Sequence, residues 1–246
     1  MNNKTSALRV KKIILSALAV SALAISANAE DKLTTHTELG FIDTQGNTQT
    51  QTFNLDSKIK KNVGEHMFTL SATAQYATTD KVETKNKYVI ELNYDYSFTE
   101  TLSFGYLLGF KQDQFSGYDY QLYTGPTVKH QTIKTPSQDL ALGLSILYTQ
   151  DQVENVDDPD SYAAYGASLA YVWDINKELK FTQDLNYRSE FSDTENYFAT
   201  SKTALMSKIS DVFSAGISYK VDYANLLPAG KEHTDRTFMA NLIIDY

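Results

Sequence analysis

The sequence has no cysteine and only 4 prolines in 246 residues. Without thiols the chain can form neither disulfide bridges nor thiolate metal sites, so a large core or a closed sheet must hold it together. The scarcity of proline permits long strands, because proline cannot donate to a strand ladder. Beyond Ser26 no apolar run is long enough to cross a bilayer as a helix. A net charge of −8 argues against nucleic acid as a partner.

The N-terminus has the three-part pattern of a secretory signal peptide. Residues 1–12 carry basic side chains and no acid, residues 13–26 are apolar, and Ala27-Asn28-Ala29 places small residues at a cleavage site. The apolar run is short for a transmembrane helix, although an uncleaved anchor is the alternative. We therefore predict a signal peptide over residues 1–29, export through the inner membrane, and one mature domain over residues 30–246.

The mature segment is rich in aromatic residues and alternates in hydropathy, and the whole chain has 17 tyrosines and 12 phenylalanines. Within residues 88–98, for example, Tyr88 and Ile90 lie on one face, whereas Glu91 and Asp95 lie on the other. Such period-2 alternation predicts strands with different solvents on their two sides. Twelve such segments follow one another: 33–42, 48–60, 68–78, 88–98, 102–115, 120–131, 140–150, 162–173, 179–191, 196–209, 213–221 and 237–246.

Strand length, aromatic placement and charge favour an outer-membrane barrel. The strands are about ten residues long, aromatic side chains recur near their ends, and the polar faces carry charges that a dry core could not hold cheaply. Longer polar connections, including residues 79–86, mostly follow odd-numbered strands, and tight turns mostly follow even-numbered ones. The predicted fold is all-β: a single antiparallel transmembrane β-barrel of about 12 strands, in which the last strand pairs with the first. A soluble lipocalin-like barrel, with its apolar face inward, is the alternative.

The polar faces supply the candidate functional residues. If the apolar faces meet lipid, the lumen is lined by Glu38, Glu91, Asp95, Lys111, Asp113, Asp184, Arg188, Lys202, Lys220 and Asp245. Tyr118 and Asp119, in a predicted loop over residues 116–119, are candidates for a binding role at the mouth together with Asp113. The plainer interpretation of this loop is structural: Gly117 takes a positive φ, and Asp119 satisfies loop amides.

The inventory of reactive groups predicts no enzyme, cofactor or metal site. His36 and Glu38 share one strand face and could form a base with its orienting acid, but no partner nucleophile is indicated. The acidic stretch 151–160 offers oxygen ligands for Ca²⁺, yet its spacing is not that of an EF-hand, and a solvated loop is the simpler interpretation. The chain also lacks zinc-ligand spacing and a glycine-rich phosphate loop.

Two stretches and the closing strand carry a resemblance to a known family. The first stretch reads Glu38-Leu39-Gly40-Phe41, then Thr44-Gln45-Gly46-Asn47-Thr48-Gln49-Thr50, then Phe53-Asn54-Leu55. The second reads Lys111-Gln112-Asp113-Gln114-Phe115-Ser116-Gly117-Tyr118-Asp119-Tyr120-Gln121. These residues resemble the YdiY-like family of salt-induced outer membrane proteins over nearly all of the mature chain. The resemblance implies an outer-membrane barrel of poorly defined function and supplies no catalytic residues.

Strand number leaves the function open. Twelve strands fall between about eight, which fill with side chains, and about sixteen, which leave a wide channel. The first hypothesis is a narrow porin-like channel for small polar solutes or ions. The alternative is a non-conducting structural or envelope-stress barrel with a charge-plugged lumen, and an outer-membrane hydrolase is a distant third. Expected partners are outer-membrane lipids, periplasmic chaperones and the barrel assembly machinery, which would read Tyr246 as its signal.

Overall fold

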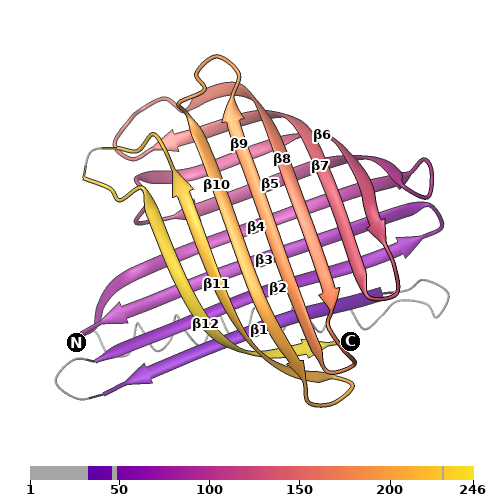
Figure 1. Ribbon diagram of the computed structural model, residues 1–246. Helices are drawn as coiled ribbons and strands as arrows, with labels where there is room; N and C mark the ends of the chain where they lie inside the picture. Colours follow the sequence, from indigo (N-terminus) through magenta and orange to yellow (C-terminus); the bar gives the residue numbers. More distant parts are fainter. Residues whose placement is uncertain (1–32, 46–48, 229) are drawn as a thin grey trace.

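The computed structural model describes residues 33–45, 49–228 and 230–246, so the predicted signal peptide lies outside the described residues. Twelve strands make up the fold: β1 (Leu33–Thr44), β2 (Thr50–Val63), β3 (His66–Thr79), β4 (Val82–Ser97), β5 (Leu102–Asp113), β6 (Tyr118–Lys134), β7 (Gln138–Val153), β8 (Asp160–Asp174), β9 (Leu179–Glu190), β10 (Tyr197–Lys208), β11 (Phe213–Ala224) and β12 (Thr234–Asp245). Each strand pairs antiparallel with the next, and β12 returns to β1 to close the barrel (Figure 1). Across these described ranges, no helix is long and apolar enough to cross a membrane.

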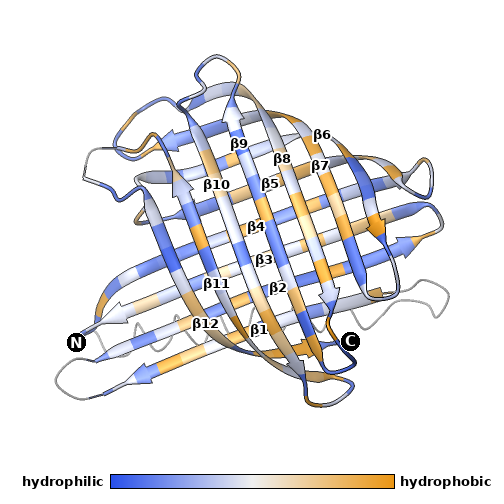
Figure 2. Ribbon diagram, viewed as in Figure 1, coloured by the Kyte–Doolittle hydropathy of each residue, from blue (hydrophilic) through white to orange (hydrophobic). Residues whose placement is uncertain are grey.

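The two faces of the wall differ in polarity, and Figure 2 shows hydrophobic and hydrophilic residues alternating along the strands. Ion pairs such as Lys202–Glu38 and Lys87–Asp222 join strands that are not neighbours, so these side chains point into the lumen. Many large apolar side chains on the outer face are exposed, among them Ile90, Leu92, Leu144, Ile146 and Phe238. An apolar exterior around a charged interior is the arrangement of a transmembrane barrel and the reverse of the soluble alternative. The predicted fold is confirmed.

Several strands run longer than predicted at the end of the barrel opposite Leu33 and Tyr246, which we call the loop end. The predicted loop over residues 79–86 is wrong, because β4 already begins at Val82. A tight hairpin joins β3 to β4, and Asp80 and Lys81 adopt positive φ angles of 48° and 68°. Such a turn needs only two residues, which the polar composition of the segment does not reveal. Pro126 lies inside β6 opposite Tyr106, so it does not break the strand.

The barrel closes through its shortest ladder, between β1 and β12. Only His36 to Leu39 pair with Leu242 to Asp245, whereas the other neighbouring strands pair along most of their length. Two further backbone hydrogen bonds extend the ladder beyond the strands: Thr35 N donates to Tyr246 O (2.6 Å), and Tyr246 N donates to Thr35 O (3.0 Å). Figure 1 shows β1 and β12 diverging from this end, which we call the terminal end. The closing ladder is therefore confined to one half of the wall.

The backbone of the last residue should matter more than its aromatic ring. Deleting Tyr246 removes both of its hydrogen bonds with Thr35, whereas Tyr246→Ala retains them. We expect the deletion to lower the folded fraction in outer membranes well below that of Tyr246→Ala. Heat-modifiable migration of unboiled samples on gels measures this fraction. Equal loss in both variants would contradict the backbone explanation and favour the aromatic side chain as the assembly signal.

Candidate functional site

The lumen is the candidate functional site, and every predicted lining residue lies on its wall. These residues are Glu38 on β1, Glu91 and Asp95 on β4, Lys111 and Asp113 on β5, Asp184 and Arg188 on β9, Lys202 on β10, Lys220 on β11 and Asp245 on β12. The alternation of the strands therefore predicts which side chains enter the lumen. Their partners across the lumen depend on the closed sheet, and they divide the lumen into three levels.

At the terminal end, the His36 ring lies between two carboxylates at the closing ladder. Its Nδ1 is 2.6 Å from Asp245 Oδ1, and its Nε2 is 3.3 Å from Glu38 Oε1. Because both ring nitrogens face carboxylates, neither is free to take a proton from a hydroxyl nucleophile. This arrangement counts against the catalytic base considered for His36 and instead links β1 to β12.

At the middle level, Lys202 reaches from β10 past β11 and β12 to side chains on β1 and β2. Its Nζ is 2.6 Å from Glu38 Oε1 and 2.9 Å from Asp56 Oδ2. Asn241 Nδ2 donates to the other oxygen of Glu38 at 2.6 Å. Glu38 is only 5% exposed, so its charge depends on these partners and on His36.

At the loop-end level, a buried ion pair crosses the lumen between β4 and β11. Lys87 Nζ lies 2.8 Å from Asp222 Oδ2 and 3.9 Å from Asp113 Oδ2. Thr200 Oγ1 donates to the second oxygen of Asp222 at 2.9 Å, and Lys220 Nζ lies 3.7 Å from Asp222 Oδ2. These side chains occupy the lumen between nearly opposite walls and narrow it.

Arg188 packs between two aromatic rings on the same level. Its guanidinium carbon lies 4.8 Å from the centre of the Tyr123 ring and 4.7 Å from that of Phe198, a geometry that favours a cation over the π faces. Tyr123 also donates its hydroxyl to Glu91 Oε1 at 2.6 Å. The ring needs glycine at position 109, because a Cβ there would lie 2.0 Å from it. Arg188 is thereby held as a fixed positive charge.

The acidic stretch 151–160 does not form one solvated loop. Asp151 belongs to β7, is buried, and accepts hydrogen bonds from Gln121 Nε2 (3.0 Å) and the Tyr162 hydroxyl (2.7 Å). Asp160 begins β8. In the part of the chain that the structure describes, no three His, Cys, Asp or Glu side chains are grouped to hold a metal ion.

The loop between β11 and β12 crosses the mouth and contacts the opposite rim. The Tyr118 hydroxyl donates to Leu226 O at 3.4 Å. Gly117 has a φ of 85°, and a Cβ there would lie 2.8 Å from the Pro228 ring. The expected positive φ of Gly117 is confirmed, and Tyr118 holds the β11–β12 loop over the lumen.

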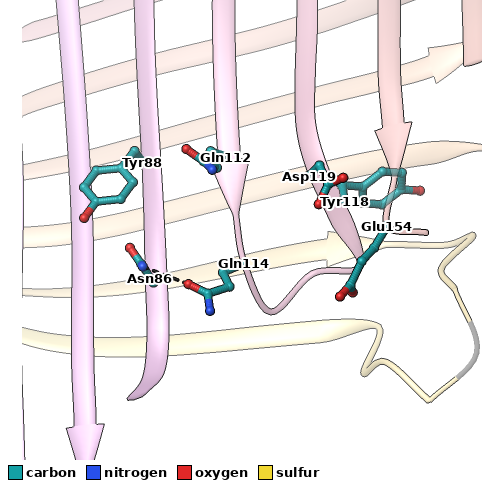
Figure 3. A pocket seen from close by; sticks show the side chains of 7 residues that line it. All are labelled: Asn86, Tyr88, Gln112, Gln114, Tyr118, Asp119 and Glu154. Carbon is teal, nitrogen blue, oxygen red and sulfur yellow. Dashed lines mark hydrogen bonds between the residues drawn. The ribbon is translucent and has the colours of Figure 1, made fainter. Parts of the chain in front are cut away.

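Asp119 lies apart from this contact, on the rim. It lines a cavity of about 240 Å³ together with Asn86, Tyr88, Gln112, Gln114, Tyr118 and Glu154 (Figure 3). The structural role predicted for Asp119 falls to Asp113, whose Oδ1 accepts from Phe115 N at 3.3 Å and whose carbonyl accepts from Ser116 Oγ at 2.8 Å. The residues brought together at the mouth are therefore Asp113 and Tyr118 rather than Asp119.

The prediction missed four residues that organise the lumen: Asp56, Lys87, Asp151 and Asp222. The last three lie just beyond the predicted strand ends, in segments read as loops or flanking residues. Hydropathy alternation weakens at strand ends because both faces become polar above the membrane. Asp56 lies within a predicted strand, and only the closed barrel shows that Lys202 reaches it.

Removing Lys202 should destabilise the barrel more than removing an exposed lysine. Lys202→Met leaves Glu38 and Asp56 without their shared cation, and unpaired buried charges cost about 3 kcal/mol or more. Lys180→Met, which breaks the half-exposed pair with Asp174, is the matched control and should cost less than about 1 kcal/mol. Urea unfolding in detergent micelles measures both. Similar midpoints for the two variants would contradict the importance of the middle level.

Comparisons with solved structures found other barrels. A structure described as "NanC porin structure in rhombohedral crystal form" is 11% identical and has a TM-score of 0.49, covering 86% of this chain and 96% of that one. The KdgM porin is 12% identical with a TM-score of 0.46, covering 87% and 98%. The translocator domain of the autotransporter NalP from Neisseria meningitidis is 10% identical with a TM-score of 0.40, covering 99% and 97%.

A comparison with curated proteins found no match. The model of a family described as "Protein of unknown function, DUF481" matches residues 37–246, nearly all of the predicted mature chain. This agrees with the resemblance to YdiY-like proteins seen in the two sequence stretches. The chain therefore belongs to this family, whose function is unknown.

Proposed function

We propose that the protein is a narrow outer-membrane channel for small polar solutes or ions. The observation that carries the proposal is a set of lumen charges without an ion pair in the terminal half. Lys58 and Lys60 on β2 and Asp184 on β9 have no ion-pair partner within 4 Å among the described residues. Unpaired charges are costly in a dry interior. This half of the lumen is therefore best explained as a hydrated vestibule.

The loop-end half supports a constriction at the other end of that vestibule. The pair Lys87–Asp222 and the stacked Arg188 place fixed charges across the lumen. Charges arranged in this way restrict passage by size and discriminate by sign. The same pairs favour the second candidate, a non-conducting envelope barrel, because a fully paired layer could also serve as a plug.

Shortening the crossing pair should widen the constriction. In Lys87→Ala/Asp222→Ala both long side chains are lost, so we expect single-channel conductance in planar bilayers to rise several-fold over the unmodified protein. Lys87→Gln/Asp222→Asn removes the same charges but keeps the side-chain volumes, and its conductance should stay close to the original. If correctly folded barrels of all three proteins show no current steps, the channel is excluded and the non-conducting barrel is favoured.

The vestibule lysines should set ion preference. Lys58→Glu/Lys60→Glu reverses two unpaired lumen charges, so the reversal potential in a KCl gradient should shift toward cation preference. The shift should shrink at high salt because mobile ions screen hydrated charges. Lys177→Glu, in the exposed turn between β8 and β9, should leave the reversal potential unchanged. An equal shift in this control would contradict the placement of selectivity in the vestibule.

A further inference from the structure

The hairpin formed by β11 and β12 leans across the barrel mouth. Asp235, near the start of β12, lies with its Oδ2 2.5 Å from Lys85 Nζ on β4. The Lys87–Asp222 pair and the Tyr118–Leu226 hydrogen bond hold the same hairpin from the opposite wall. These contacts draw the loop-end half of β12 inward, toward strands that are not its neighbours in the sheet.

Strand β1 does not lean inward with β12. It stays paired with β2 as far as Thr44, while its described pairing with β12 stops at Leu39. Continued register would place Asp43 opposite Phe238, but these residues are not paired. Gly40 still packs against Asn241 and Ala240, so the part of the described wall that is unpaired lies in the loop-end half between residues 41–44 and 234–239.

A cavity with both polar and apolar lining lies beside this opening, between β12 and strands β2 to β4. Its volume is about 270 Å³, and it is lined on one side by Asp235, Arg236 and Thr237 of β12. The other side comes from β2 to β4, including Gln75 and Lys85. Gln75 is 3% exposed, and within the described chain its Oε1 has no hydrogen-bond partner. Buried acceptors without a partner are uncommon, so this oxygen points to a ligand that donates a hydrogen bond.

The strand edges beside the cavity are apolar on the outside. Phe41 near the end of β1 and Phe238 on β12 face outward, and each is more than half exposed. An open strand edge also presents unpaired backbone groups, which the hydrocarbon of a bilayer cannot satisfy. The opening thus has a polar atom without a partner in the described chain, Gln75 Oε1, on its inner side and exposed apolar side chains on its outer side.

We propose that this lateral opening binds an amphiphile that carries an anionic headgroup and an acyl chain. The headgroup occupies the cavity, where Lys85 and Arg236 outnumber Asp235 in charge and a headgroup hydroxyl donates to Gln75. The chain lies along Phe41 and Phe238 on the outer wall. The site goes beyond the channel function and does not depend on conduction along the barrel axis.

A lysophosphatidylglycerol with a photoactivatable group in its acyl chain tests the site in proteoliposomes. Peptide mapping should find most of the adducts on residues 41–44 and 236–240, and far fewer on β6 and β7. The Arg236→Gln variant should carry several-fold fewer adducts at these residues. A several-fold excess of glycerophosphate, which has no chain, should leave labelling unchanged. Even labelling around the barrel, or full competition by glycerophosphate, would overturn the proposal.

A second experiment closes the opening with an engineered disulfide. Because the chain has no native cysteine, only the two introduced residues can form this bond. The pair Asp43→Cys/Phe238→Cys should abolish labelling when oxidised and restore it when reduced. The control pair Leu39→Cys/Leu242→Cys lies in the existing ladder and should label normally in both states. If the first disulfide does not form, a bulky maleimide on Phe238→Cys should block labelling, and the same reagent on Leu242→Cys should not. Labelling that survives both closures would overturn the proposal.

Discussion

The need to pair every backbone amide and carbonyl inside a bilayer governs this structure. Eleven of the strand junctions meet it with long antiparallel ladders, whereas the twelfth, between β1 and β12, meets it only from His36 to Leu39. Side chains in the lumen reinforce that short ladder. His36, Glu38 and Asn241 connect the two strands directly, and Lys202 ties Glu38 to β10. Barrel closure and lumen electrostatics are therefore parts of one network.

Both halves of the lumen hold paired charges, such as Lys129–Asp95 near the terminal end, and charges without an ion pair among the described residues, such as Lys111 near the loop end. In the loop-end half, Lys87 and Asp222 pair across the lumen, and Arg188 packs against Phe198 on the neighbouring strand β10 and Tyr123 on the more distant β6. In the terminal half, Lys58 and Lys60 remain without ion pairs in the described chain. Burying an ion pair costs little free energy only where its geometry is good, and an unpaired charge is stable in the lumen only if water solvates it. Lys58 and Lys60, unpaired among the described residues, are the basis on which we propose a hydrated vestibule, and the pair Lys87–Asp222 is the basis on which we propose a constriction.

The inward lean of β11 and β12 links the constriction to the open wall. The contacts that draw the hairpin over the mouth, such as Lys85–Asp235, also keep β12 away from the end of β1. The same contacts therefore lie beside both the mouth and the lateral opening that we propose.

The sequence by itself determined the barrel, its twelve strands and the face on which each lining residue lies. Alternation has a strict period of two, so Glu91, Lys111 and Lys202 could be placed in the lumen from local pattern alone. The tight turn at Asp80 and Lys81 escaped prediction because polar residues do not distinguish a two-residue hairpin from a loop. Only the closed structure decided which charges meet, since Lys87 and Asp222 lie 135 positions apart. It also decided where the wall opens, because that depends on the competition between cross-lumen ion pairs and the last strand ladder.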